Sequence, residues 1–311
     1  MINWPLETYW GEKYPIFSEQ DNFAINCLSS IFNPSSNSLL FIKEVTGPLI
    51  EELTSIHGSI IITKPEYRSV VKHLSASNGF VFDDDPRYKF AEILEPLCNT
   101  VSLRGTFTWN EKYQAYLGKD VSISTDVYIE PNVTIGDNAV IGEHVSILTG
   151  ARIGPNVIIG SNSIIRENAV IGGWGFGIAQ RKGYRSIRIP HIGGVSVGAH
   201  VEIGALTTIC SGTIDPTVIG DFVKIDDHVH IAHNCVIGEN TIVTACAEIS
   251  GSVKIGRDCW IAPNVSIING ISIGNNATVG IGAVILKPVE DNAVVVGNPG
   301  KVIRMNSAKN A

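Results

Sequence analysis

The dominant feature of the sequence is a six-residue repeat that fills most of its second part. Isoleucine occupies nine consecutive positions six residues apart, from Ile123 to Ile171, and the series resumes for three positions after an interruption. It starts again at Ile219 and continues, always as Ile or Val, to Ile285, which gives 24 such positions. Self-similarity at a fixed period indicates a repeat architecture.

The period has a simple physical interpretation. Six residues are too few for a helix or hairpin with its own core, but they fit one short strand and a corner. Three such sides close a triangular coil of about 18 residues, and coils stack at the usual strand spacing of ~4.8 Å. Because hexapeptide repeats are typical of parallel β-helices, we expect a mainly β protein with a left-handed parallel β-helix. The 24 repeat positions predict about eight coils at three repeats a coil.

Residues 1–105 lack the repeat and alternate between strand and helix patterns, which predicts a small N-terminal α/β domain. Apolar runs predict strands at 38–42, 59–63 and 79–82, and apolar spacing predicts helices at 47–55, 67–76 and 86–97. The remaining boundaries follow from composition: a linker over 106–118, the β-helix over 119–290 and a C-terminal tail over 291–311.

Two interruptions break the period, at 172–194 and at 211–216. We expect residues 172–194 to leave the prism as a flap. Insertions in solenoids often lie on the binding face, so the basic residues of this segment favour a flap over an anionic ligand. These residues are Arg181, Lys182, Arg185 and Arg188.

Charge and composition exclude several classes of protein. The net charge of −7 makes a basic nucleic-acid-binding face unexpected. No apolar run approaches the ~20 residues of a membrane span, and no secretory signal is visible at the N-terminus. The six cysteines form no CxxC pair, which is typical of reduced thiols. We therefore expect a cytoplasmic protein with neither a membrane span nor a nucleic acid partner.

The segment 225–234 is unusually dense in groups that can hold or move a proton, with His228, His230 and His233 beside two aspartates. Histidine is the usual general base near neutral pH. One coil of about 18 residues places Gly251 next to His233, and a glycine lets its backbone N–H approach a ligand atom. A base and an amide donor on adjacent coils are what acyl transfer needs. His228 and His230 are equally compatible with surface corners.

Several longer stretches are similar to one family: Gly175-Phe-Gly, 189–198, 201–209, 215–226, and 231–238 with its Ile-Ala-His-Asn motif. Together they resemble the UDP-3-O-acylglucosamine N-acyltransferase family of the lipid A pathway, within the hexapeptide-repeat acyltransferases. The N-terminal part is similar to that family's uridine-binding domain at 38–41, 58–63 and 81–91.

The resemblance implies a homotrimer with active sites between neighbouring prisms. It implies that His233 deprotonates the amine of a nucleotide-linked amino sugar, which attacks an acyl thioester, and that the Gly251 backbone stabilises the oxyanion. It implies no bound cofactor or metal ion, because acyl-CoA or acyl-carrier protein serves as co-substrate. The residues expected to bind substrate are Asp226, Asp215, His230, Asn234, Phe41, Phe176 and Arg188.

The sequence also departs from that family. Phe41 is followed by Ile-Lys-Glu-Val-Thr-Gly instead of the Asn-Pro-Lys-Tyr segment that holds uracil, which leaves the nucleotide open. Ile271 replaces a second histidine. The ending over 294–304 resembles coenzyme-A-dependent sugar acetyltransferases, and residues 251–311 carry six Lys or Arg against three Asp or Glu. The acyl donor therefore stays open.

The sequence leaves three alternative functions open. A sugar O-acetyltransferase of the same fold would use the same base. A γ-type carbonic anhydrase is also a left-handed prism trimer, and its zinc is held by three histidines across subunits. His228, His230 and His233 suggest it, although their spacing does not resemble that family's. The third alternative is a non-catalytic scaffold.

Overall fold

The computed structural model describes residues 14–19, 23–100 and 107–306. These residues form two compact units. The first, called the N-terminal unit, contains residues 14–100 and Gly177–Pro190, and the second, called the prism, contains residues 107–176 and 191–306. Part of the long insertion therefore belongs to the N-terminal unit.

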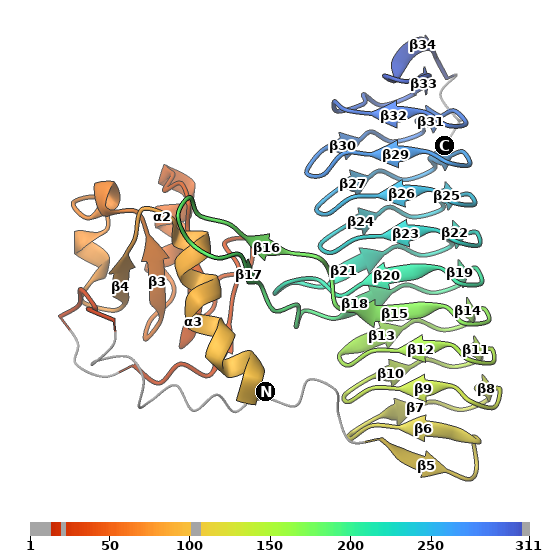
Figure 1. The fold of residues 1–311 in the computed structure, drawn as a ribbon, viewed down its shortest axis with the longest axis horizontal. Coiled ribbons are helices and arrows are strands. Elements are labelled where there is room, and N and C mark those ends of the chain that lie inside the picture. The colour runs from red at the N-terminus through yellow and green to blue at the C-terminus, as the bar shows by residue number, and fades with distance from the viewer. Residues whose placement is uncertain (1–13, 20–22, 101–106, 307–311) are drawn as a thin grey trace. The chain divides into compact units, whose positions relative to one another are not determined.

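The described residues of the prism form three sheets, one for each side of the coil (Figure 1). The β23 face consists of β5 (Thr108–Asn110), β6 (Ala115–Leu117), β9 (Thr134–Ile135), β12 (Arg152–Ile153), β15 (Val170–Gly173), β20 (Thr208–Cys210), β23 (His230–Ile231), β26 (Glu248–Ile249), β29 (Ser266–Ile267) and β32 (Val284–Ile285). The β24 face consists of β7 (Ser122–Ile123), β10 (Val140–Ile141), β13 (Val157–Ile159), β18 (Val195–Val197), β21 (Thr217–Ile219), β24 (Val236–Ile237), β27 (Lys254–Ile255) and β30 (Ser272–Ile273). The β25 face consists of β8 (Tyr128–Ile129), β11 (Ser146–Ile147), β14 (Ile164–Ile165), β19 (Glu202–Ile203), β22 (Lys224–Ile225), β25 (Ile242–Val243), β28 (Trp260–Ile261), β31 (Thr278–Val279), β33 (Ala293–Val296) and β34 (Lys301–Met305).

The register of the strands follows the repeat. His230 pairs with Glu248, eighteen positions later, and both side chains point outward from the parallel ladder. The next residues, Ile231 and Ile249, point inward and are fully buried. Burying one such side chain contributes roughly 1.5–3 kcal/mol, and the aligned isoleucines form one continuous core. The left-handed parallel β-helix predicted from the repeat is confirmed.

The corners between the strands explain why asparagine recurs in the repeat. The later residue of each corner commonly adopts a positive φ, as at Asn138 (58°) and Asn240 (55°). Asparagine tolerates this left-handed conformation better than most residues. Its amide also binds the next coil: Asn138 Nδ2 donates to Asn156 Oδ1 at 3.3 Å, and Asn240 Nδ2 donates to Asp258 Oδ1 at 2.7 Å.

Both ends of the prism differ from the expected boundaries. Within the segment expected to be a linker, β5 and β6 form an antiparallel hairpin, and β6 pairs with β9. The rings of Trp109 and Tyr116 meet edge to face across this hairpin, with centroids 5.2 Å apart. In the expected tail, β33 pairs with β31 and then with the antiparallel strand β34. These hairpins cover the terminal coils with hydrogen-bonded strands.

The described part of the N-terminal unit has a four-stranded parallel sheet in the order β1 (Cys27–Leu28), β2 (Ser38–Phe41), β3 (Ile60–Thr63), β4 (Gly79–Phe82). Its α-helices are α2 (Gly47–Thr54) and α3 (Pro86–Thr100), close to the predicted ranges. The helix expected over 67–76 is wrong: the chain forms two short 3-10 turns, Pro65–Tyr67 and Lys72–Leu74. Among the described residues, no helix has both the length and the apolarity needed to cross a bilayer.

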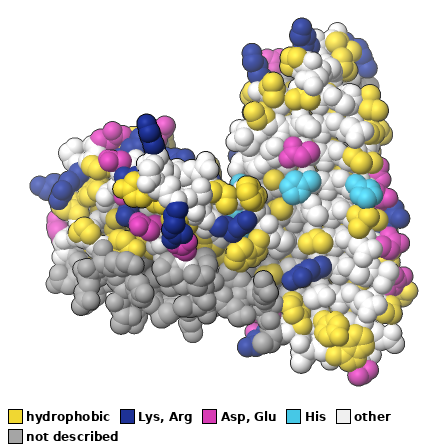
Figure 2. Space-filling view, in the orientation of Figure 1, with side chains coloured by type: hydrophobic (Ala, Val, Ile, Leu, Met, Phe, Trp, Pro, Cys, Tyr) yellow, Lys and Arg dark blue, Asp and Glu magenta, His cyan; other side chains and the backbone are white. Residues whose placement is uncertain are grey.

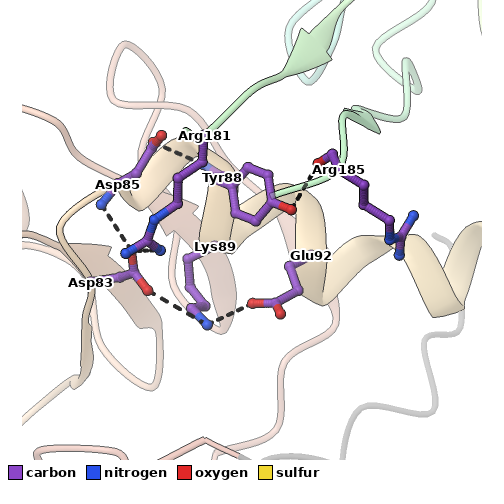
Figure 3. A network of polar contacts seen from close by, with 7 residues as sticks. All are labelled: Asp83, Asp85, Tyr88, Lys89, Glu92, Arg181 and Arg185. Atoms are coloured by element: carbon purple, nitrogen blue, oxygen red, sulfur yellow. Dashed lines mark hydrogen bonds and ion pairs between the residues drawn. The ribbon is translucent and has the colours of Figure 1, made fainter. Parts of the chain in front are cut away.

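The insertion forms a small hairpin of β16 (Ile178–Ala179) and β17 (Ile187–Arg188) that packs on α3. Figure 3 shows its polar contacts: Arg181 donates to Asp83 at 2.9 Å, and the hydroxyl of Tyr88 donates to the backbone oxygen of Arg185 at 2.9 Å. Arg185 also makes a two-pronged contact with Glu95, in which Nη1 donates to Oε1 at 2.7 Å. In the structure, carboxylates of the same unit compensate the charges of these two arginines.

Candidate active site

Both interruptions of the repeat lie at one corner of the prism. This corner, between the β23 face and the β24 face, is called the His233 corner. Residues 172–194 follow β15 and lead into β18, residues 211–216 lie between β20 and β21, and His233 follows β23. The prism is therefore irregular where the candidate base lies.

His233 and Gly251 face each other across adjacent coils of this corner. The N–H of Ser252 donates to the backbone oxygen of His233 at 2.9 Å, which fixes the register. A β-carbon built on Gly251 would lie 2.8 Å from both Cε1 and Nε2 of His233, so only glycine lets the ring lie this close to the backbone. In the described part of the chain, the amide N–H of Gly251 donates to no acceptor. The candidate base and a backbone amide without an acceptor among the described residues thus belong to neighbouring residues of adjacent coils.

The side chain of Asn234 determines which nitrogen of His233 carries the proton. Its Oδ1 accepts hydrogen bonds from the backbone N–H of Thr213 at 3.2 Å and from the Thr213 hydroxyl at 2.7 Å. A backbone N–H can only donate, so the amide atom at this position is the oxygen. His233 Nδ1, 3.0 Å from the same oxygen, must therefore be the protonated nitrogen. This leaves a lone pair on Nε2, the nitrogen beside Gly251.

The two ends of the insertion also pack at this corner. A β-carbon on Gly175 would lie 2.9 Å from Nε2 of His191 and from Cβ of His233. His191 is 3% exposed, and its ring centroid lies 4.9 Å from that of His233. The insertion therefore supports the His233 side chain from one side, a role that its sequence did not indicate.

A strip of polar side chains runs along the β23 face beside the corner. Thr208, His230 and Glu248 are register partners on β20, β23 and β26. The Thr208 hydroxyl lies 2.7 Å from His230 Nδ1, and the Ser250 hydroxyl donates to the Glu248 carboxylate at 3.1–3.2 Å. Figure 2 shows histidine and acidic side chains gathered on this face. Sequence analysis missed Glu248, although its position one coil after His230 could have revealed it.

The remaining expected substrate-binding residues are spread more widely. Asp226 directly follows β22, where its carboxylate accepts from the backbone N–H groups of Asp227 and Ala245 at 2.8 and 3.1 Å. The backbone oxygen of Asp215 lies 3.5 Å from the Asn234 amide nitrogen, at the His233 corner. These contacts give both aspartates structural roles within the prism.

The aromatic and basic expected residues are distributed over both units. Phe41 is in the N-terminal unit, where its ring packs against Phe90 with centroids 4.9 Å apart. Arg188 lies on the hairpin in the same unit. Phe176 ends the prism part of the insertion and is 79% exposed.

The cysteines near the corner are poor nucleophiles. Burial raises the pKa of the Cys235 thiol to about 12 and also raises the pKa of Cys210. Thiols with raised pKa values are protonated at neutral pH and unreactive. The chemistry available at this corner is therefore proton transfer by His233 and hydrogen bonding by Gly251.

The three histidines of the motif occupy different parts of the coil. His228 lies at the corner before β23, His230 on β23, and His233 at the corner after it. Among the described residues, no three His, Cys, Asp or Glu side chains come together as a metal-binding group. Within one described chain, the three histidines therefore do not converge on one point.

The repeats are similar to those of known bacterial transferases. A family model described as "Bacterial transferase hexapeptide (six repeats)" matches residues 114–148, 138–173, 216–251 and 252–287. The UDP-3-O-acylglucosamine N-acyltransferase of Hahella chejuensis is 47% identical over 97 residues, which cover 31% of this chain and 28% of that protein. The enzyme of the same name from Dechloromonas aromatica is 52% identical over 84 residues, covering 27% and 24%. The matched segments thus span less than a third of these two relatives.

Solved structures resemble the prism more extensively. The UDP-N-acetylglucosamine acyltransferase of Francisella novicida matches 62% of this chain and 69% of its own, with a TM-score of 0.57 and 27% identity. The corresponding enzyme of Campylobacter jejuni matches 62% and 73%, with a TM-score of 0.56 and 27% identity. The resemblance to hexapeptide-repeat acyltransferases predicted from the sequence is confirmed.

Proposed function

We propose that this chain, which carries the repeats of the bacterial transferase hexapeptide family, is an N-acyltransferase. It moves an acyl group from a thioester, acyl-CoA or acyl-carrier protein, to the amine of a nucleotide-linked amino sugar in lipopolysaccharide or surface glycan synthesis. The observation that carries the proposal is the pairing of the His233 Nε2 lone pair with the Gly251 amide one coil away. The printed names of the relatives, acyltransferases acting on UDP-linked glucosamine derivatives, support it.

The reaction uses these two groups without a covalent enzyme intermediate. Nε2 of His233 accepts a proton as the sugar amine attacks the thioester carbonyl. The amide N–H of Gly251 donates to the oxyanion of the tetrahedral intermediate. When the intermediate collapses, the C–S bond breaks and the leaving thiolate takes the proton from the imidazolium. A general base of this kind contributes typically ~10²–10⁴-fold.

The other parts of the chain have roles consistent with this chemistry. The N-terminal unit holds the nucleotide, and Phe41 at the end of β2 offers a ring on which a base can stack, since ligands of parallel sheets bind at the carboxyl ends of strands. Three copies associate as a homotrimer, as the resemblance implies. The basic residues over 251–311 receive the phosphates of coenzyme A or the acidic surface of a carrier protein.

A product screen tests this function. Purified protein is incubated with pooled UDP- and dTDP-linked amino sugars and with acetyl-, 3-hydroxybutyryl- and longer acyl donors, and products are identified by mass spectrometry. We expect an amino sugar whose mass rises by one acyl group, with fragmentation placing that group on nitrogen. Acylation on oxygen would make the enzyme a sugar O-acyltransferase, and no transfer to any acceptor would contradict the proposal.

A further inference from the structure

We propose that the Glu248 carboxylate binds the N–H of the acceptor amine and makes the site select an amine over a hydroxyl. This inference rests on the proposed function and adds a specificity-determining residue to it. Glu248 lies on β26, three residues before Gly251, with its side chain on the outer surface of the β23 face.

The carboxylate is turned toward the His233 corner. The hydroxyl of Ser250, the residue next to Gly251, donates to both carboxylate oxygens, at 3.1 and 3.2 Å. The carboxylate therefore points along its strand toward Ser250, the neighbour of Gly251.

No cation compensates this charge. Among the described residues, no Lys, Arg or His forms an ion pair with Glu248. His230, its register partner, has its Nδ1 directed to the Thr208 hydroxyl on the preceding strand. A half-buried carboxylate with a single hydroxyl donor can accept further hydrogen bonds, because two oxygens offer about four lone-pair sites.

The chemistry of the acceptor explains why a carboxylate belongs here. A neutral amine has two hydrogens and one lone pair, so one N–H can donate to His233 Nε2 and the other to Glu248 while the lone pair faces the carbonyl. A hydroxyl has one hydrogen, which the base requires. A hydroxyl acceptor would leave the partly desolvated carboxylate without a donor, and sites with an unmatched polar group reject such ligands.

The test compares UDP-glucosamine with UDP-glucose, which differ by an amine and a hydroxyl at one carbon. Glu248→Val is the informative variant because valine already occupies equivalent outward positions on the β23 face, at Val170 and Val284. Glu202→Val is the matched control, since Glu202 precedes an inward isoleucine on β19 of the β25 face in the same way. Isothermal titration calorimetry measures the affinity of each protein for both sugars.

We expect the wild type and Glu202→Val to bind UDP-glucosamine more tightly than UDP-glucose. In Glu248→Val the affinity for UDP-glucosamine falls about ten- to a hundredfold, as for a lost hydrogen bond to a charged group, whereas the affinity for UDP-glucose does not fall and rises to the extent that the unmatched carboxylate had opposed its binding. Equal binding of both sugars by the wild type, or an unchanged preference in Glu248→Val, would overturn the inference. The affinities do not depend on turnover, so failure here is distinguishable from failure of the product screen.

Where the screen yields an acylated product, steady-state kinetics add a second readout. Glu248→Val should raise KM for the amino sugar at least about tenfold while kcat changes far less, because His233 and Gly251 remain in place. A fall in kcat with KM unchanged would contradict a binding role for Glu248.

Discussion

The imidazole of His233 occupies the space that a side chain at residue 251 would need. The ideal β-carbon position of Gly251 lies 2.8 Å from Nε2 of that ring. The ring therefore lies beside an amide N–H that has no acceptor within the described residues. A proton acceptor and a backbone hydrogen-bond donor thus lie on adjacent coils of one corner, and attack on a carbonyl requires both kinds of group.

Gly251→Ala should abolish most activity while the fold persists. The added methyl group would displace the imidazole or the backbone amide, and losing one oxyanion donor costs typically ~10²–10³ in kcat. Steady-state kinetics and a thermal melt measure the two effects. Gly282→Asn is the control, because asparagine already occupies the same kind of corner at Asn264 and Gly282 has open space around it. Full activity in Gly251→Ala would refute a tight contact between the His233 imidazole and the backbone of residue 251.

Asn234→Asp should move the acid limb of the pH–rate profile to higher pH. A carboxylate beside Nδ1 stabilises a charged imidazolium, whereas the reaction needs the neutral ring. Turnover should therefore be lost at a higher pH as the solution is acidified. The measurement is kcat/KM between pH 5.5 and 9. An unmoved limb would show that Asn234 does not contact the base.

Asn234→Gly removes the side-chain amide of residue 234 and leaves the backbone geometry of the corner unchanged. Glycine accepts the φ of 60° at this corner without strain, so the variant should fold normally. It should lose turnover because the protonated nitrogen of His233 is no longer fixed. Wild-type turnover in this variant would contradict the role assigned to the amide.

The thiol of Cys235 should resist alkylation in the native protein. Burial raises its pKa to about 12, so about one thiol in 10⁴ is ionised at pH 8. Cys246 is exposed and should react first. Iodoacetamide treatment at pH 8, followed by peptide mass spectrometry, compares the two. Equal modification of both cysteines before unfolding would contradict the buried position of Cys235.

Breaking the ion pairs of the hairpin should expose it to protease. In the variant Asp83→Asn with Glu95→Gln, the carboxylates that bind Arg181 and Arg185 become neutral. Trypsin should then cleave after Lys182 several times faster, measured by mass spectrometry of timed digests. Glu44→Gln changes an exposed carboxylate outside the network and should leave the rate unchanged. Equal rates in both variants would show that these pairs do not hold the hairpin.

The fold was predictable because the repeat is local and periodic. Three sides of six residues fix an eighteen-residue register, so the pairing of His233 with Gly251 follows from arithmetic along the chain. The same arithmetic places Glu248 over His230. A corner that recurs every coil is a feature that sequence alone can locate.

The insertion and the corner contacts depend on distant partners. Arg181 and Arg185 resembled anion ligands because nothing in the sequence pairs them with Asp83 and Glu95, about 90 positions away. A period break brings Thr213 against the amide of Asn234 and turns the amide oxygen to His233, a contact that the sequence did not indicate. Interactions across irregular segments have no sequence period to reveal them.

Turnover of His233→Ala in the acyl-transfer assay tests the role of the base most directly. His200→Ala is the control, since His200 stacks on Phe222 at another corner, with ring centroids 4.9 Å apart. We predict that His233→Ala melts like the wild type and loses about 10²–10⁴-fold in kcat, while His200→Ala stays active. Turnover of His233→Ala within about threefold of the wild type would contradict the role of His233 as the general base.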